Sequence, residues 1–167
     1  MLSSSAPVVL LQHGGLNDLS GKTGLAMLRY RSGPIVAVID PAFAGSDLQQ
    51  VSGIERAVPV VADMAAALAY EPEVAVVGLA PSGGRLPQAM RADLLVALQA
   101  GLNLASGLHS RLGDDPELAA ACSRAGQWIW DLRQEPAGLE VAAARAAALP
   151  CPAAGCWPWV RIWPWAR

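Results

Sequence analysis

The chain has 167 residues, of which 53% are hydrophobic and 16% are charged, and its formal net charge is −2. A chain of this length and hydrophobicity can bury the core of one domain, which excludes a disordered protein. The small negative charge offers no electrostatic basis for binding nucleic acid, and no apolar run reaches the roughly 18 residues needed to cross a bilayer. Because the N-terminus lacks the basic start of a secretory signal, we expect a cytoplasmic protein with no membrane partner.

Short apolar runs recur along the chain and predict strands at 8–11, 35–39, 58–61, 74–79, 102–105 and 128–130. Most of them are continuous and rich in β-branched residues, which is typical of parallel strands buried on both faces. Pro59 in the third run predicts an edge strand or a strand that starts late.

Helical patterns separate the runs and predict helices at 20–30, 63–70, 87–100 and 115–125. Ser20, Asp63 and Asp115 are candidate N-caps, and Gly126 is a candidate stop for the last helix. Alternating strands and helices indicate βαβ units with right-handed crossovers. We therefore predict an α/β fold: a Rossmann-like, doubly wound, mainly parallel sheet of about six strands with helices on both faces. The pattern leaves the strand order open.

The composition changes at residue 151, so we expect a Rossmann-like domain at 1–150 and a foreign tail at 151–167. The tail holds four of the six tryptophans of the chain and contains Trp-Pro-Trp twice. Proline is excluded from helix interiors and from central strands, so the tail does not continue the sheet.

A shifted reading frame offers one explanation of the tail, and a genuine aromatic segment is the other. Tryptophan has a single codon, so a frame that starts at the third base of the Cys156 codon has leucine, alanine and glycine forced at fixed positions. With permitted codons elsewhere it reads Leu-Ala-Val-Gly-Thr-Asp-Met-Ala-Val-Gly-Lys. This is an apolar strand followed by a loop one residue longer than the usual phosphate-binding loop.

Ligands of doubly wound sheets bind beyond the carboxyl ends of the strands, and polar or glycine-rich residues follow several strands here. The candidate ligand-binding residues are Gly21, Lys22, Thr23, Asp40, Ser82, Gly83, Gly84, Arg85, Ser106, Gly107 and His109.

Each candidate after the first two strands has two interpretations, one as a ligand contact and one as an ordinary structural or solvent-exposed residue. Gly21-Lys22-Thr23 resembles the end of a phosphate loop, although Leu16 stands where the upstream glycine belongs. Lys22 is either an anion contact at a helix start or a solvated lysine. The first loop lacks the dinucleotide fingerprint of spaced glycines. Asp40 is either a ribose-binding acid or the start of a turn.

The candidates after the fourth and fifth strands also have alternatives. Gly83 and Gly84 would let backbone approach a ligand, and Arg85 could bind a carboxylate or phosphate with two hydrogen bonds. The same loop could be a plain turn with a surface arginine. His109 is either an acid, base or anion donor, or a histidine bonded to backbone.

Cysteine and histidine spacing predicts no metal site and no disulfide framework. The three cysteines are irregularly spaced, and neither histidine has a partner at a metal-ligand spacing. Cys122, in a predicted helix, is expected to be a small buried hydrophobe. We identified no catalytic residue from these patterns.

Several segments together resemble the N-terminal domain of the D-glutamate N-acetyltransferase family over roughly residues 8–150. They are Lys-Thr-Gly-Leu-Ala-Met-Leu-Arg-Tyr at 22–30, Val-Ala-Val-Ile-Asp at 36–40, Gly-Leu-Ala-Pro-Ser-Gly-Gly-Arg-Leu-Pro at 78–87, Gly-Leu-Asn-Leu-Ala-Ser-Gly-Leu-His at 101–109 and Trp-Asp-Leu-Arg at 130–133. The resemblance implies a second, P-loop-containing domain that begins where the tail starts, so the chain is expected to be truncated.

The resemblance further implies acetyl transfer from acetyl-CoA to the amino group of D-glutamate. A chain without the phosphate loop is then expected to be inactive alone, while still binding a small ligand such as an amino acid, a nucleotide or CoA. The alternatives are a stand-alone module that binds a nucleotide or small acid, and a scaffold that forms homo-oligomers.

Overall fold

The computed structural model describes residues 2–81, 83, 86–135 and 138, and the chain divides into units at 1–134 and 135–167. The account below concerns the first unit. The tail at 151–167 and the residues Ser82, Gly84 and Arg85 lie outside the described residues, as do the predictions made for them.

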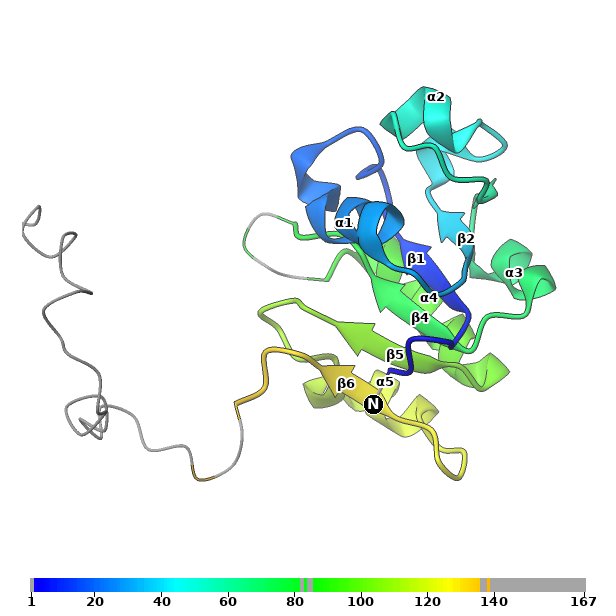
Figure 1. The fold of residues 1–167 in the computed structure, drawn as a ribbon. Coiled ribbons are helices and arrows are strands. Elements are labelled where there is room, and N and C mark those ends of the chain that lie inside the picture. The colour runs from blue at the N-terminus through cyan, green and yellow to red at the C-terminus, as the bar shows by residue number, and fades with distance from the viewer. Residues whose placement is uncertain (1, 82, 84–85, 136–137, 139–167) are drawn as a thin grey trace, which may run out of the picture. The chain divides into compact units, whose positions relative to one another are not determined.

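Six parallel strands form one sheet in the order β3-β2-β1-β4-β5-β6 (Figure 1). They are β1 (Val8–Leu11), β2 (Ile35–Ile39), β3 (Val60–Val61), β4 (Val74–Val77), β5 (Asn103–Ser106) and β6 (Ile129–Asp131). The predicted α/β fold is therefore confirmed. β3 lies at one edge and begins directly after Pro59, as expected of a strand whose proline cannot donate to the ladder.

Among the described residues, five α-helices connect the strands: α1 (Lys22–Tyr30), α2 (Leu48–Ser52), α3 (Met64–Ala67), α4 (Gln88–Ala100) and α5 (Pro116–Ala121). Asp63 and Asp115 cap α3 and α5 with their side chains, as predicted. The Ser20 cap was wrong, because the Asp18 carboxylate accepts from the Ser20 N–H and caps a 3₁₀ turn, Leu19–Gly21, that precedes α1.

Two further differences concern helix lengths. α2 was not predicted, since its five residues are too few to show a period. α5 ends at Ala121 rather than at 125. Beyond its end, the Arg124 guanidinium donates to the carbonyls of Gln99 and Ala100 at the end of α4. None of the described helices is long and apolar enough to cross a bilayer.

Alternate strand residues face two separate cores. On one face α1 and α2 pack over residues such as Val8, Leu10 and Val38, while α3, α4 and α5 pack on the other face over residues such as Val9 and Ala75. Figure 1 shows α1 in front of the sheet and α4 and α5 behind it. The helices thus leave the strand ends as the part of the domain open to a ligand.

Candidate functional site

The register brings the strand ends to one level. Leu11 pairs with both Ile39 and Val77, so Gln12 and Asp40 follow their strands at the same edge of the sheet. The chain leaves β1 toward β2 on one side and returns at β4 on the other, which makes the gap between β1 and β4 the topological switch point.

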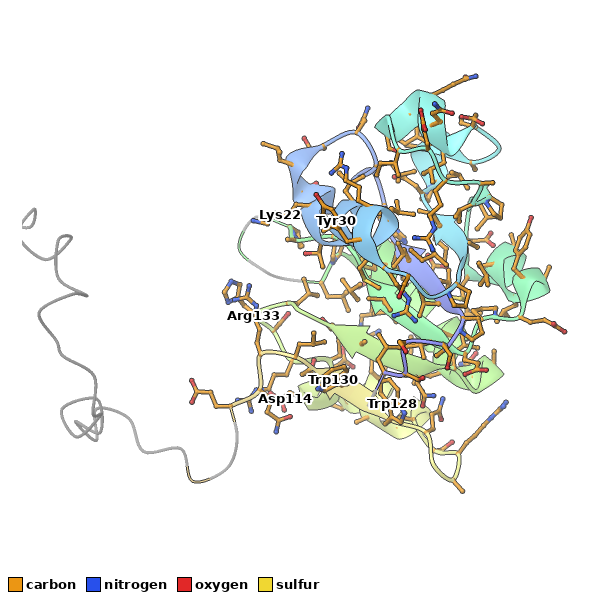
Figure 2. The ribbon with its side chains drawn as sticks, in the orientation of Figure 1. Lys22, Tyr30, Asp114, Trp128, Trp130 and Arg133 are labelled. Atoms are coloured by element: carbon orange, nitrogen blue, oxygen red, sulfur yellow. The ribbon has the colours of Figure 1, made fainter. Side chains whose placement is uncertain are left out.

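A cavity of about 390 Å³ opens at this edge, beside the switch point. Its lining comes from the start of α1, the segments after β4 and β5, and the residue two places after β6. The lining residues are Lys22, Thr23, Val77, Leu79, Ala80, Pro81, Gly83, Gly107, Leu108, His109 and Arg133. In Figure 2, Lys22 and Arg133 lie at the same edge of the sheet. A larger but shallower hollow of about 880 Å³ runs along α1 from Lys22 and Thr23, which it shares with the cavity, to Ser32.

The cavity gathers five of the predicted residues from the start of α1 and from the loops after β4 and β5: Lys22, Thr23, Gly83, Gly107 and His109. From their strand-end positions alone, Lys22 was a candidate anion contact or a solvated lysine, and His109 was a candidate acid, base or anion donor or a histidine bonded to backbone. Their common location supports a site for an anionic ligand, since both can donate hydrogen bonds to a carboxylate or phosphate.

Arg133 is a charged residue of the cavity that was not among the predicted candidates. Its Nε donates to the Gly107 carbonyl at 2.7 Å, which ties the residue to the loop after β5. Its Nη1 lies 3.5 Å from both ring nitrogens of His109, so the guanidinium lies against the imidazole rather than aiming at one nitrogen. The signal was available, because Arg133 follows a strand that ends in Asp131 and closes a segment carrying the family resemblance.

Asp40 is structural in its described contacts. Its side chain is fully buried and accepts hydrogen bonds from the backbone N–H groups of Gly14 at 2.8 Å, Leu16 at 3.3 Å and Ala42 at 3.2 Å. It therefore fixes the loop after β1 and starts a turn, and it is not among the residues that line the cavity.

Asp131 plays the corresponding role on the other side of the sheet. Its buried carboxylate accepts from Leu112 N at 2.8 Å and Gly113 N at 3.0 Å, in the connection that follows β5. Ser106, another predicted residue, is buried and its Oγ accepts from Leu108 N at 3.1 Å. Both residues shape the His109 loop instead of lining the cavity.

Gly21 is required by packing rather than by a phosphate. A Cβ on Gly21 would lie 1.9 Å from the Gly15 carbonyl oxygen, so the loop closes on itself at these two glycines. The loop also uses its own donors, since Gly15 N, Asp18 N and Gly21 N bond to carbonyls within it or just before it. A phosphate cradle needs such N–H groups free. Of this motif, Lys22 and Thr23 line the cavity and Gly21 does not.

His13 and Asp93 form a buried contact behind the sheet edge that no sequence pattern indicated. His13 has a φ of 41°, in the left-handed region, and its Nε2 lies 2.9 Å from Asp93 Oδ2 without alignment for a hydrogen bond. The other oxygen of Asp93 accepts from Met64 N at 2.8 Å. This contact ties the loop after β1 to α4 and to the start of α3.

An ion pair stands next to the His109 loop. Arg91 donates two hydrogen bonds to Asp115, at 2.9 and 2.8 Å, and also contacts Glu117. The hydrogen bonds from Arg91 lower the pKa of Asp115 to about 2, so this carboxylate is ionised at neutral pH. The pair borders a second hollow of about 520 Å³ that shares His109 with the cavity.

Over the described ranges, no group of three or more histidine, cysteine, aspartate or glutamate side chains could hold a metal ion. Cys122 is half-buried with a free thiol, and its burial raises the pKa of that thiol. It therefore remains a thiol rather than a thiolate at neutral pH.

Comparison with known proteins identifies relatives of this fold. A family model described as a domain of unknown function, DUF1611_N, a Rossmann-like domain, matches residues 41–135. A DUF1611 family protein from Anabaena variabilis, known from its crystal structure, has a TM-score of 0.81 and 49% sequence identity, over 90% of this chain and 43% of that chain. A Tritonibacter scottomollicae protein named D-glutamate N-acetyltransferase is 43% identical over 58 residues, which is 35% of this chain and 17% of the relative. The chain thus spans less than half the length of either relative.

Proposed function

Because the chain belongs to the DUF1611_N family of Rossmann-like domains, we propose that it binds the acidic acceptor of an acetyl-CoA-dependent N-acetyltransferase that acts on D-glutamate. The observation that carries the proposal is the convergence of Lys22, His109 and Arg133 on one cavity at the carboxyl edge of the sheet. The name of the Tritonibacter relative supplies the substrate and the reaction.

The cavity suits a small acid better than a whole coenzyme. Its volume of about 390 Å³ is near the lower end of the roughly 300–1,000 Å³ typical of small-molecule sites. D-Glutamate carries two carboxylates, and a cationic side chain can hold each of them with a charge-assisted hydrogen bond. Arg133 uses Nε on Gly107 and places Nη1 against His109, which leaves Nη2 to meet a ligand. Lys22, across the cavity, is the partner for the second carboxylate.

Acetyl-CoA supplies a thioester whose carbonyl carbon is attacked by the substrate amine. The carbon–sulfur bond breaks, CoA leaves as the thiolate, and the nitrogen loses one proton. Lys22 and Arg133 hold the carboxylates and so fix the direction of the amine, which removes part of the entropic barrier to reaction. His109 is the imidazole of the cavity, and imidazole is the most common general base. We assign to it the acceptance of the amine proton.

Calorimetric titration of the chain with D-glutamate tests the proposal. We expect Lys22→Ala to weaken binding by about tenfold, as for the loss of one charge-assisted hydrogen bond. Arg29→Ala is the matched control, because Arg29 is on the same helix but lines a different hollow. Equal loss of affinity in the two variants, or an unchanged affinity in both, would refute the assigned site. Since the cavity is too small for a whole coenzyme, we expect binding by this chain, and turnover only in a protein that also holds the coenzyme.

A binding module for a nucleotide or small acid is the second candidate, because cationic side chains also bind phosphate. Titration with AMP and with acetyl-CoA separates the two. Tighter binding of AMP than of D-glutamate, lost on Lys22→Ala, would favour the module.

A further inference from the structure

Gln12 directly follows β1, and its side chain is fully buried. Its Nε2 donates to the Gly21 carbonyl at 3.2 Å, whereas Oε1 is buried with no hydrogen-bond partner. A buried acceptor without a donor costs stability. Such groups are rare in folded proteins, and each one calls for a reason.

A socket of glycines surrounds the Gln12 carboxamide. A Cβ on Gly24 would lie 2.6 Å from Gln12 Cδ and Nε2, and a Cβ on Gly78 would lie 2.6 Å from Oε1. Together with Gly21, which accepts the hydrogen bond, these residues place α1 and the end of β4 in direct contact with the carboxamide. A side chain at Gly24 or Gly78 would displace it.

The socket glycines alternate with residues that line the cavity. Lys22 and Thr23 lie between Gly21 and Gly24, while Val77 and Leu79 flank Gly78. Gln12 therefore lies beneath the cavity, where its two walls meet.

Two backbone hydrogen bonds join the same walls. Gly24 N donates to Gly78 O at 2.9 Å, and Ala80 N donates to Ser20 O at 2.6 Å. Both cross from the start of α1 to the segment that follows β4. Their alignment depends on the distance between the walls, which the Gln12 carboxamide fills.

We propose that Gln12 is a positioning residue, which sets the start of α1 against the segment after β4 and thereby places Lys22 at the cavity. The identity of the ligand rests on the proposed function, whereas the coupling of the two walls does not. The junction requires a flat, rigid amide. The fold therefore tolerates the loss of stability caused by the unpartnered Oε1 of Gln12.

Gln12→Met tests the inference, because methionine has a similar shape and lacks the amide. The matched control is Gln127→Met at the opposite edge of the sheet. Gln127 Nε2 donates to the carbonyls of Leu98 and Leu102 at 2.9 and 2.7 Å, so its role is to hold the fold together. Each variant is measured by D-glutamate titration, thermal unfolding and amide hydrogen exchange.

Gln12→Met is expected to weaken D-glutamate binding by about tenfold and to speed amide exchange at Gly24 and Ala80 by a similar factor. Its melting temperature should change by less than about 3 °C, because one hydrogen bond is lost and one unpartnered oxygen is removed. Gln127→Met should show the opposite pattern, with a lower melting temperature and unchanged affinity. Unchanged affinity and exchange in Gln12→Met, or losses that merely track its melting temperature, would overturn the inference.

The two proposals fail in different ways. If the unaltered chain binds no D-glutamate, the proposed function is wrong, and exchange at Gly24 and Ala80 still decides the role of Gln12. If Gln12→Met does not fold, the NMR signals of the Gln12 side-chain amide in the unaltered chain are measured instead of the variant. They should shift on addition of D-glutamate, and shifts absent at saturation would overturn the inference.

Discussion

Asn substitution at Asp40 distinguishes an internal clamp from a ribose-binding acid, the two readings that the sequence left open. The buried carboxylate accepts two hydrogen bonds on Oδ1, from Gly14 and Ala42, and one on Oδ2, from Leu16. In Asp40→Asn one oxygen becomes an NH₂ group, which cannot accept from the Leu16 N–H. Leaving that donor unpaired costs about 1 kcal/mol, near the low end for such groups because the bond is long.

The two remaining hydrogen bonds lose their charge assistance, and neutral bonds are roughly half as strong, which removes about 1 kcal/mol from each. We therefore expect Asp40→Asn to lower the free energy of unfolding by about 3 kcal/mol in urea titrations followed by circular dichroism. Asp47→Asn is the control. Asp47 accepts one bond, from Gln50 N at 3.0 Å, as the cap of α2, and asparagine caps about as well, so the change should stay within about 0.5 kcal/mol. A loss at Asp40 as small as that at Asp47 would refute the clamp.

Three other substitutions test the edge of the sheet. Asp131→Ala removes the acceptor of two backbone N–H groups and should destabilise the fold by about 2–3 kcal/mol in the same urea assay, whereas a loss below about 1 kcal/mol would contradict that role. The lowered pKa of Asp115, about 2, means that its pairing with Arg91 stabilises the fold fully above the ordinary value near 3.8 and is lost as pH falls through 2. Unfolding monitored between pH 5 and pH 2 should thus lose part of its acid sensitivity in Asp115→Asn, and an unchanged pH profile would count against the pairing. Gly21→Ala places a methyl carbon 1.9 Å from the Gly15 carbonyl oxygen and should lower the melting temperature by more than about 5 °C, a result that a freely adjustable phosphate loop would not give.

The fold could be predicted because its signal is local. Continuous β-branched runs such as 35–39, bounded by turn residues, mark buried parallel strands wherever they occur. Strand order was not accessible, because right-handed crossovers fix the face of each helix and not the distance that each connection spans. α2 was not predicted, since its five residues, capped by Asp47, are too few to show a helical period.

The location of the candidate site was predictable, but which residues line the cavity and which bond to backbone groups was not. The rule that ligands bind at the carboxyl ends of strands placed Lys22 and His109 on the cavity. The same rule could not separate them from Asp40 and Ser106, which occupy equivalent positions along the chain but turn inward to backbone donors. Which way a strand-end side chain points depends on the neighbouring loop, and that loop is distant in sequence.

The inward aspartates also decide how this edge can hold an anion. In dinucleotide-binding sheets the backbone N–H groups of the first loop hold the pyrophosphate. Here Gly14 and Leu16 of that loop donate to Asp40, and the loop after β5 donates to Asp131. With these donors committed, an anion at the cavity is met by side-chain cations, which favour the carboxylates of a small acid as readily as a phosphate. The domain therefore combines the strand order of a dinucleotide-binding sheet with a first loop whose Gly14 and Leu16 N–H groups are already bonded, and tight binding of NAD through that loop would contradict this reasoning.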